Sequence, residues 1–248
     1  HFTHFNAPDF YRRASIVTIH DLTLSFFPGK KMTSYFQRFA YHITLKKALG
    51  KAKKIIAVSQ YTEKDLKRLF HIPAEKIKVI YEGVNANFHQ EHNQKVIQKI
   101  LEKYNIHAPY LLYTGVWRSH KNLLRLIEAF HILKTDYDFD GSLVITGRKD
   151  ALYEPELKQK TFSLQLENDI VFTGLVSDGE LVLLYNGALA YVFPSLYEGF
   201  GLPPLEAMQC GVPVVAANSS SIPEICGMDN ALFFDPHNPK DMAQKIYE

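Results

Sequence analysis

The sequence predicts an α/β fold of the doubly wound class, and two observations support this prediction. Short runs of aliphatic and β-branched residues alternate with longer amphipathic segments along the chain, which is the order of strands and helices in α/β domains. The runs are nearly all apolar rather than alternating, as in parallel strands buried on both faces. The 248 residues, 46% of them hydrophobic, suit one large or two small domains.

Each apolar run is predicted as a strand, and each amphipathic segment between runs as a helix. The predicted strands span residues 15–19, 54–58, 77–81, 110–114, 142–146, 170–173, 190–194 and 213–216. The predicted helices span residues 32–49, 62–70, 96–104, 121–133, 154–166, 179–185 and 204–209. The chain lacks an initial Met and ends at Glu248 inside a further helix-like segment, so we expect both ends to be truncated.

A polar stretch without a strand pattern interrupts the alternation at about residues 82–109. We interpret it as the connection between two domains. The predicted organisation is an N-terminal Rossmann-like domain at 1–88, a linker at 89–109 and a C-terminal Rossmann-like domain at 110–248. The first domain has only three predicted strands, so we expect it to be incomplete.

Composition excludes several classes of protein. A formal net charge of +2 gives no electrostatic reason to expect nucleic-acid binding. Cys210 and Cys226 lack metal-ligand spacing and are too few for a disulfide framework, which favours a reducing, cytoplasmic compartment. No apolar run approaches the roughly 20 residues that a membrane-spanning helix needs.

The most informative segment, SLYEGFGLPPLE, follows the predicted strand 190–194. Its glycines let backbone N–H groups approach a ligand closely, and its two prolines fit the first turn of a helix. This places Glu198 on the loop and Glu206 in the first helical turn, where a carboxylate is favoured. A carboxylate can accept hydrogen bonds from vicinal hydroxyls, so both glutamates suit a sugar or a ribose. A plain glycine turn with a helix-stabilising Glu is the alternative for either residue alone.

A second segment runs from the strand 110–114 through Gly115 into a basic loop with Arg118 and Lys121, and then into a helix. A helix N-terminus beside an Arg and a Lys suits a diphosphate. Single basic residues are more often solvated surface charges. Here the strand and its glycine place the loop at the carboxyl edge of the sheet, where open α/β sheets bind ligands.

The string EGFGLPPLE, in which seven residues separate two glutamates, resembles the signature of glycosyltransferase family 4, a family of GT-B fold. The resemblance extends from about His20 to the C-terminus. It implies two Rossmann-like domains and retaining transfer of a hexose, mannose or glucose, from a nucleotide-sugar to a saccharide or lipid-linked acceptor. It also implies that no metal or other cofactor takes part, that Glu198 contacts the donor sugar and that Glu206 contacts the ribose.

The same resemblance assigns roles to further residues. An Arg and a Lys neutralise the leaving diphosphate, although the Arg that often follows the glycine is Val116 here. A His after the first strand faces the donor sugar, whereas a lone His at a strand end is usually structural. The predicted catalytic residues are His20, Arg118, Lys121 and Glu198. The predicted substrate-binding residues are Gly115, Gly147, Arg148, Gly174, Leu175, Gly199, Phe200, Gly201, Leu202 and Glu206.

The segment DYDFDG at 136–141 begins like a calcium loop, but its twelfth position, which needs a Glu, is Gly147. Asp138 and Asp140 also resemble the metal-binding pair of the other glycosyltransferase fold. They precede a predicted strand, however, and so belong to the edge of the sheet opposite the ligand crevice. We therefore predict no metal.

Other hypotheses stay open. The chain could be a nucleotide-sugar-binding fragment without catalysis, because transfer needs donor and acceptor enclosed together, or a nucleotide-sugar epimerase of similar fold. A dinucleotide oxidoreductase is disfavoured, because no Gly-x-Gly-x-x-Gly follows an early strand. Five lysines between residues 46 and 54 follow an aromatic-rich helix, so peripheral contact with a membrane is a further alternative.

Overall fold

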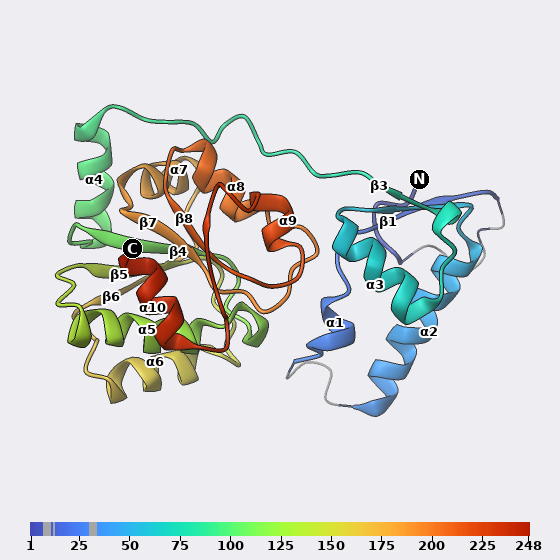
Figure 1. Ribbon diagram of the computed structural model, residues 1–248, viewed down its shortest axis with the longest axis horizontal. Coiled ribbons are helices and arrows are strands. Elements are labelled where there is room, and N and C mark those ends of the chain that lie inside the picture. Colours follow the sequence, from blue (N-terminus) through green and yellow to red (C-terminus); the bar gives the residue numbers. More distant parts are fainter. Residues whose placement is uncertain (7–10, 12, 30–33) are drawn as a thin grey trace. The chain divides into compact units, whose positions relative to one another are not determined.

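The computed structural model describes residues 1–6, 11, 13–29 and 34–248. The chain folds into two units, which we describe separately (Figure 1). Unit 1 consists of residues His1–Gly83, Tyr197–Gly201 and Ser220–Ile225. Unit 2 consists of residues Val84–Leu196, Leu202–Ser219 and Cys226–Glu248. The division at 1–88, 89–109 and 110–248 stays a prediction.

Unit 1 contains a parallel three-stranded sheet in the order β1-β2-β3. The strands are β1 Ile16–Ile19, β2 Lys54–Ala57 and β3 Ile77–Val79. The helices are α1 Thr23–Phe26, α2 Tyr35–Lys51, α3 Gln60–Phe70 and the 3₁₀ helix η1 Ala74–Lys76. Strand residues and the inner faces of α2 and α3 form its core, which also takes in Tyr197. Residues 32 and 33 of the first predicted helix lie outside the described residues.

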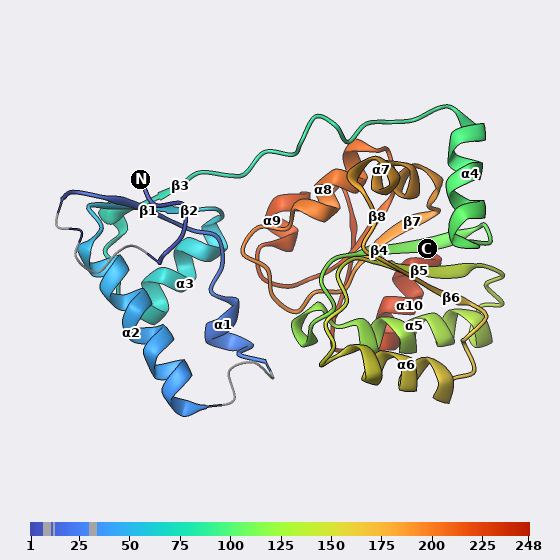
Figure 2. The ribbon, with the colours of Figure 1, turned by 180° about the vertical axis from the view of Figure 1, so that it is seen from behind.

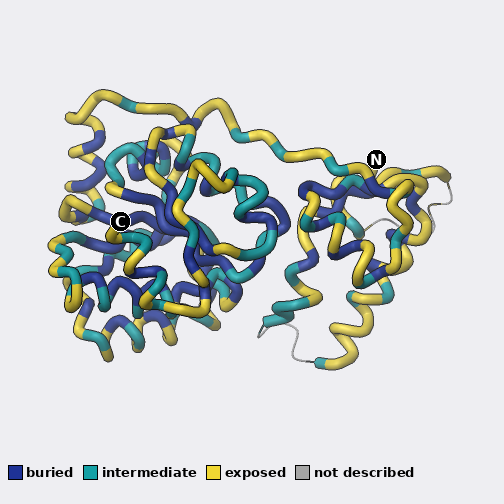
Figure 3. Tube along the Cα trace, viewed as in Figure 1, coloured by how far each residue is buried: buried dark blue, intermediate teal, exposed yellow. Residues whose placement is uncertain are grey.

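Unit 2 contains a parallel six-stranded sheet in the order β6-β5-β4-β7-β8-β9. The strands are β4 Tyr110–Thr114, β5 Ser142–Thr146, β6 Ile170–Gly174, β7 Ala190–Phe193, β8 Val214–Ala217 and β9 Leu232–Phe234. Every residue of β4, β5, β7 and β8 is buried (Figure 3). This burial explains why these strands are mostly apolar on both faces.

Helices cover both faces of this sheet. The helices of unit 2 are α4 Gln94–Tyr104, η2 Ser119–Lys121, α5 Leu123–Asp136, α6 Glu154–Ser163, α7 Asp178–Gly187, α8 Leu202–Gln209 and α10 Pro239–Tyr247. Helix α9 Ile222–Cys226 belongs to unit 1 except for its last residue. Figures 1 and 2 show α4, α7 and α8 on one face and α5, α6 and α10 on the other. The predicted doubly wound α/β class is therefore confirmed.

None of the helices in the part of the chain that the structure describes has the length and apolar character that a membrane crossing demands.

Candidate functional site

The strand order of unit 2 reverses between β4 and β7. The chain moves from β4 outwards to β5 and β6, and from β7 outwards in the opposite direction to β8 and β9. Renumbered from β4, the order is that of the Rossmann fold, which binds its ligand outside the carboxyl ends of the strands at this switch point. Both predicted motifs follow strands that meet there, because one comes after β4 and the other after β7.

Three glycines end neighbouring strands side by side. The Gly115 N–H donates to the Thr146 carbonyl at 3.1 Å, and the Gly147 N–H donates to the Gly174 carbonyl at 2.9 Å. Gly115, Gly147 and Gly174 have φ values of 144°, 122° and 74°, which favour glycine. A Cβ at Gly147 would overlap the Gly115 carbonyl. The structure thus brings these three predicted binding residues together at the carboxyl edge of the sheet, with Leu175 exposed beside them.

A buried asparagine joins three loops at the same edge. Asn122 has a left-handed backbone, with φ at 62°. Its side-chain amide donates to the carbonyls of Pro194, after β7, at 3.1 Å and of Pro236, after β9, at 2.7 Å. Its carbonyl oxygen accepts a bond of 2.9 Å from Arg125. The side chain therefore fixes the basic loop after β4 against the loops that follow two other strands.

Replacing Asn122 by alanine should lower the free energy of unfolding by roughly 2–4 kcal/mol. The change removes two buried hydrogen bonds and leaves two carbonyls without that donor, and it places a residue less tolerant of φ > 0 at a left-handed position. Urea unfolding measures the effect. Asn105→Ala is the matched control, because Asn105 is also left-handed, with φ at 57°, but exposed. Equal losses in the two variants would contradict a tying role for Asn122.

The two basic residues that were predicted to act together have different neighbours. The Lys121 ammonium lies 5.7 Å from the centre of the Phe193 ring, at the carboxyl end of β7. The Arg118 guanidinium instead faces the loop after β5, with its Nε 3.9 Å from a carboxylate oxygen of buried Asp150. Arg148, in that same loop, is exposed. Lys121 therefore lies at the carboxyl end of β7, beside the switch point, and Arg118 contacts the loop after β5, which also carries Arg148.

Glu206 does not lie in the first helical turn, so that prediction is wrong. Helix α8 begins at Leu202, two residues earlier than expected, which makes Glu206 its fifth residue. The two prolines occupy the second and third positions of the helix, where an N–H has no intrahelical partner, so they do not delay its start. The Glu206 carboxylate accepts a hydrogen bond from Tyr185 at 3.1 Å, and burial raises its pKa.

The other predicted glutamate, Glu198, lies on a loop as predicted and belongs to unit 1. Its N–H donates to the Ser220 hydroxyl at 2.9 Å. The Ser221 hydroxyl lies within donating distance of the carbonyls of Glu198, at 3.1 Å, and Phe200, at 2.7 Å. Serine side chains of the segment after β8 thus fix the backbone that carries Glu198.

The glycine at position 199 packs against the backbone of unit 1. A Cβ at Gly199 would overlap the carbonyl oxygen of His20. The Gly199 carbonyl accepts hydrogen bonds from the hydroxyls of Ser59, at 2.6 Å, and Thr62, at 3.1 Å. Ser59 also caps α3 by accepting a bond from the Thr62 N–H at 3.0 Å. The backbone of Gly199 therefore lies against the backbone of His20, and the contact leaves no room for a side chain at position 199.

His20 has a partner at each ring nitrogen. Its Nδ1 lies 2.6 Å from a carboxylate oxygen of Glu82, and its Nε2 lies 2.9 Å from the Thr3 carbonyl. Both partners are acceptors, which suits a ring that donates from both nitrogens. The side chain stays 48% exposed. Sequence reasoning missed Glu82, because 62 residues separate it from His20.

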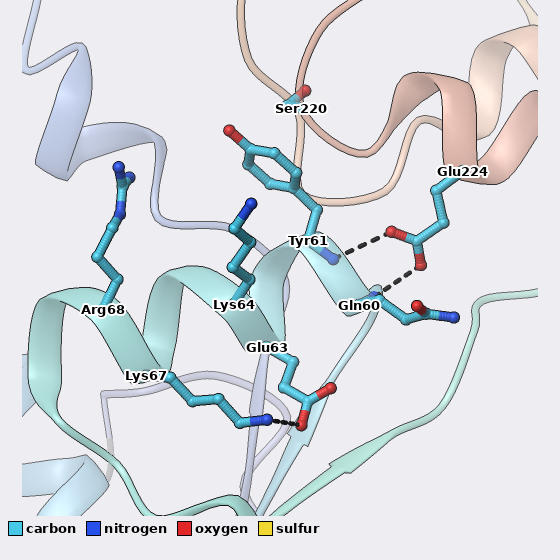
Figure 4. A pocket seen from close by; sticks show the side chains of 8 residues that line it. All are labelled: Gln60, Tyr61, Glu63, Lys64, Lys67, Arg68, Ser220 and Glu224. Carbon is cyan, nitrogen blue, oxygen red and sulfur yellow. Dashed lines mark hydrogen bonds and ion pairs between the residues drawn. The ribbon is translucent and has the colours of Figure 1, made fainter.

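Unit 1 also has a pocket at the start of α3 (Figure 4). Its volume is about 710 Å³. The Glu224 carboxylate accepts the N–H groups of Gln60, at 2.7 Å, and Tyr61, at 3.0 Å, and so occupies the helix N-terminus. Lys64 and Ser220 line the pocket as well. Ser220 also accepts the Glu198 N–H through its hydroxyl, so this pocket adjoins the glycine loop, residues 198–201.

Within the described ranges, no three or more His, Cys, Asp or Glu side chains are grouped so that they could hold a metal ion.

The comparisons with known families identify the chain. It matches the sequence model of the glycosyl transferases group 1 over residues 93–248 and that of Glycosyltransferase Family 4 over residues 2–88. The chain belongs to the glycosyl transferases group 1. Membership of this family confirms the resemblance that the EGFGLPPLE string indicates.

Two proteins that are similar in sequence to this chain are O-antigen chain mannosyltransferases. The chain is 31% identical to the O-antigen chain mannosyltransferase B of Escherichia coli, over 98% of this chain and 64% of that protein. It is 32% identical to the O-antigen chain mannosyltransferase RfbU of Salmonella typhimurium, over 98% of this chain and 62% of that protein. The chain therefore spans somewhat less than two thirds of the length of these relatives.

Solved structures confirm the GT-B fold of this group 1 member. Anabaena HepE in complex with UDP-glucose superposes with a TM-score of 0.79 at 23% identity, covering 95% of this chain and 62% of HepE. WaaG, a glycosyltransferase of lipopolysaccharide biosynthesis, superposes with a TM-score of 0.79 at 16% identity, covering 99% of this chain and 66% of WaaG.

Proposed function

We propose that this chain carries the donor site of a retaining glycosyltransferase. The enzyme moves a hexose from a nucleotide-sugar to a saccharide or lipid-linked saccharide. One observation carries most of this proposal: the parallel sheet of unit 2 brings Lys121 and the helix of Glu206 to adjacent strands at the switch point of a Rossmann-type order. A cation for a diphosphate and a carboxylate for hydroxyls are what a nucleotide-sugar requires there.

In the proposed mechanism, the bond between the sugar and the diphosphate breaks, and negative charge grows on the leaving diphosphate. The oxygen of an acceptor hydroxyl forms the new bond to the same sugar carbon, and its proton passes to the departing diphosphate. Lys121 stabilises this charge, with Arg118 as the second cation. Backbone N–H groups of the glycine-containing loops after β4 and β7 bind the diphosphate, and they do not need to rearrange during the reaction. Glu206 accepts the ribose hydroxyls, Glu198 orients the donor sugar, and His20 contacts that sugar. These side chains supply the charge stabilisation, so we expect no metal or cofactor requirement.

Mannose is the proposed donor sugar, because both O-antigen relatives are named mannosyltransferases; glucose is the alternative. A role in polysaccharide biosynthesis follows from the same relatives. We place the protein in the cytoplasm, with peripheral contact at the inner membrane face where a lipid-linked acceptor would lie. Unit 1 is the acceptor side in this proposal, since its pocket adjoins the loop of Glu198.

A second candidate is a fragment that binds the donor and transfers nothing. The observation that favours it is the coverage of less than two thirds of the named relatives.

Acceptor-dependent nucleotide release distinguishes these functions. GDP-mannose and UDP-glucose are each incubated with the chain and with the full-length enzyme, with and without a mannose-containing oligosaccharide. A transferase releases nucleotide only when the acceptor is present, whereas an epimerase releases none. A donor at 100 times its Kd should in either case stabilise the chain by about 2.7 kcal/mol. The proposed function is contradicted if no donor stabilises the chain thermally and the full-length enzyme releases no nucleotide.

A further inference from the structure

A buried network of hydroxyls leads to Glu206 inside unit 2. The Tyr185 hydroxyl, on α7, lies 3.1 Å from a carboxylate oxygen of Glu206 and 3.3 Å from the Pro203 carbonyl. It also lies 3.1 Å from the Thr114 hydroxyl, which is itself 3.1 Å from the Tyr191 hydroxyl. Tyr185 is fully buried. The network thus connects the last residue of β4 with the carboxylate on α8 after β7.

The direction of the bond to Glu206 follows from the environment of Tyr185. Burial raises the pKa of this phenol well above its usual range, so the phenol keeps its proton at neutral pH. The Glu206 carboxylate can only accept when it is ionised. Tyr185 is therefore the donor. Burial raises the pKa of Glu206, and the bond from Tyr185 acts in the opposite direction by favouring the ionised form.

The hydrogen bond that Tyr185 donates to one carboxylate oxygen also limits the rotation of the Glu206 side chain. A Glu side chain has three rotatable bonds, and immobilising such a side chain when a ligand binds weakens the complex. A donor that holds the carboxylate in advance removes this cost, and it leaves the other carboxylate oxygen and the remaining lone pairs to accept hydroxyls.

We infer that Tyr185 is a positioning residue, whose phenol holds the Glu206 carboxylate in the orientation that accepts the ribose hydroxyls of the donor nucleotide. This inference rests on the proposed function, because it needs Glu206 to bind ribose. It predicts that loss of the Tyr185 hydroxyl weakens binding only of ligands that carry those hydroxyls.

The test is isothermal titration of the 248-residue chain with GDP, UDP and ADP. The tightest of the three and its 2′,3′-dideoxy analogue are then titrated into the variants. Tyr185→Phe should weaken binding of the ribonucleotide roughly tenfold, a difference of about 1.4 kcal/mol, and change binding of the dideoxy analogue less than twofold. Tyr110→Phe is the matched control. It removes an equally buried hydroxyl that donates at 2.7 Å to Leu184, on the same helix α7, and both affinities should stay unchanged.

Each outcome separates this inference from the proposed function. Equal weakening of both ligands by Tyr185→Phe would show a merely structural role and overturn the inference. If Tyr185→Phe binds both ligands unchanged while Glu206→Gln loses affinity for the ribonucleotide alone, the inference is overturned and the proposed function stands. Wild-type binding by Glu206→Gln would instead refute the ribose role of Glu206.

A second variant covers the case in which Tyr185→Phe does not fold. Thr114→Val removes the hydroxyl that contacts the Tyr185 phenol from β4. The phenol is then fixed less well, so the affinity for the ribonucleotide should fall by roughly threefold. This is a smaller fall than the one of roughly tenfold that we expect for Tyr185→Phe. The affinity for the dideoxy analogue should not change. An equal fall for both ligands would contradict the inference.

Discussion

Turnover should fall roughly 10²–10³-fold when Lys121 is replaced by alanine in the full-length enzyme, the range typical for loss of one group that stabilises developing charge. The Lys121 ammonium lies over the end of β7, beside the switch point. Charge on the leaving diphosphate grows as the sugar departs, so the loss should appear mainly in kcat. Acceptor-dependent nucleotide release at saturating donor measures it.

Lys158→Ala is the control for this prediction. Lys158 is also in unit 2, but its side chain is 64% exposed and pairs at 2.9 Å with Glu154 one helical turn away. Such a surface pair contributes little to stability, so the variant should keep wild-type turnover. Unaltered kcat in Lys121→Ala would remove Lys121 from the mechanism.

The free energy of unfolding should fall by at least roughly 3 kcal/mol when Gly147 is replaced by alanine, because backbone strain and overpacking add. The residue has φ at 122°, and a Cβ there would overlap the Gly115 carbonyl. To admit the methyl group, the ends of β4 and β5 must separate. The loop that carries Lys121 would then be displaced, so nucleotide affinity should fall as well.

Urea unfolding of the chain measures this effect, with Gly179→Ala as the control. A Cβ at Gly179, in the first turn of α7, would meet no described atom within 4 Å beyond its chain neighbours and the backbone of its own helix. Its stability should therefore change by less than about 0.5 kcal/mol. The same stability in both variants would show that the ends of the strands can rearrange freely.

The sequence is most informative for elements whose burial is uniform. Strands β4 and β5 begin and end at the predicted residues, because all five positions of each are buried and most are apolar. Strand β9, Leu232–Phe234, escaped prediction because it has three residues at the edge of the sheet, only one of them buried. The start of α8 was misplaced because proline at the second and third positions of a helix is compatible with an earlier start.

Long-range contacts explain what sequence reasoning could not predict about the site. The glycine loop at residues 198–201 and the basic loop at residues 115–121 each lie within a short stretch of sequence, so both motifs can be recognised in the sequence alone. Tyr185, by contrast, has the sequence pattern of an ordinary buried helix residue, and only the fold places its hydroxyl 3.1 Å from Glu206. The inclusion of Tyr197–Gly201 in unit 1 likewise depends on partners more than a hundred residues away, such as Asp65, which accepts a 2.8 Å bond from Tyr197.

A crystal structure of this chain with a bound nucleoside diphosphate tests the central claim most directly. We expect the diphosphate oxygens within hydrogen-bonding distance of the Lys121 ammonium and the ribose hydroxyls on the Glu206 carboxylate, with backbone N–H groups of the glycine loops beside them. A nucleotide bound elsewhere on unit 2, with neither Lys121 nor Glu206 in contact with it, would contradict the account.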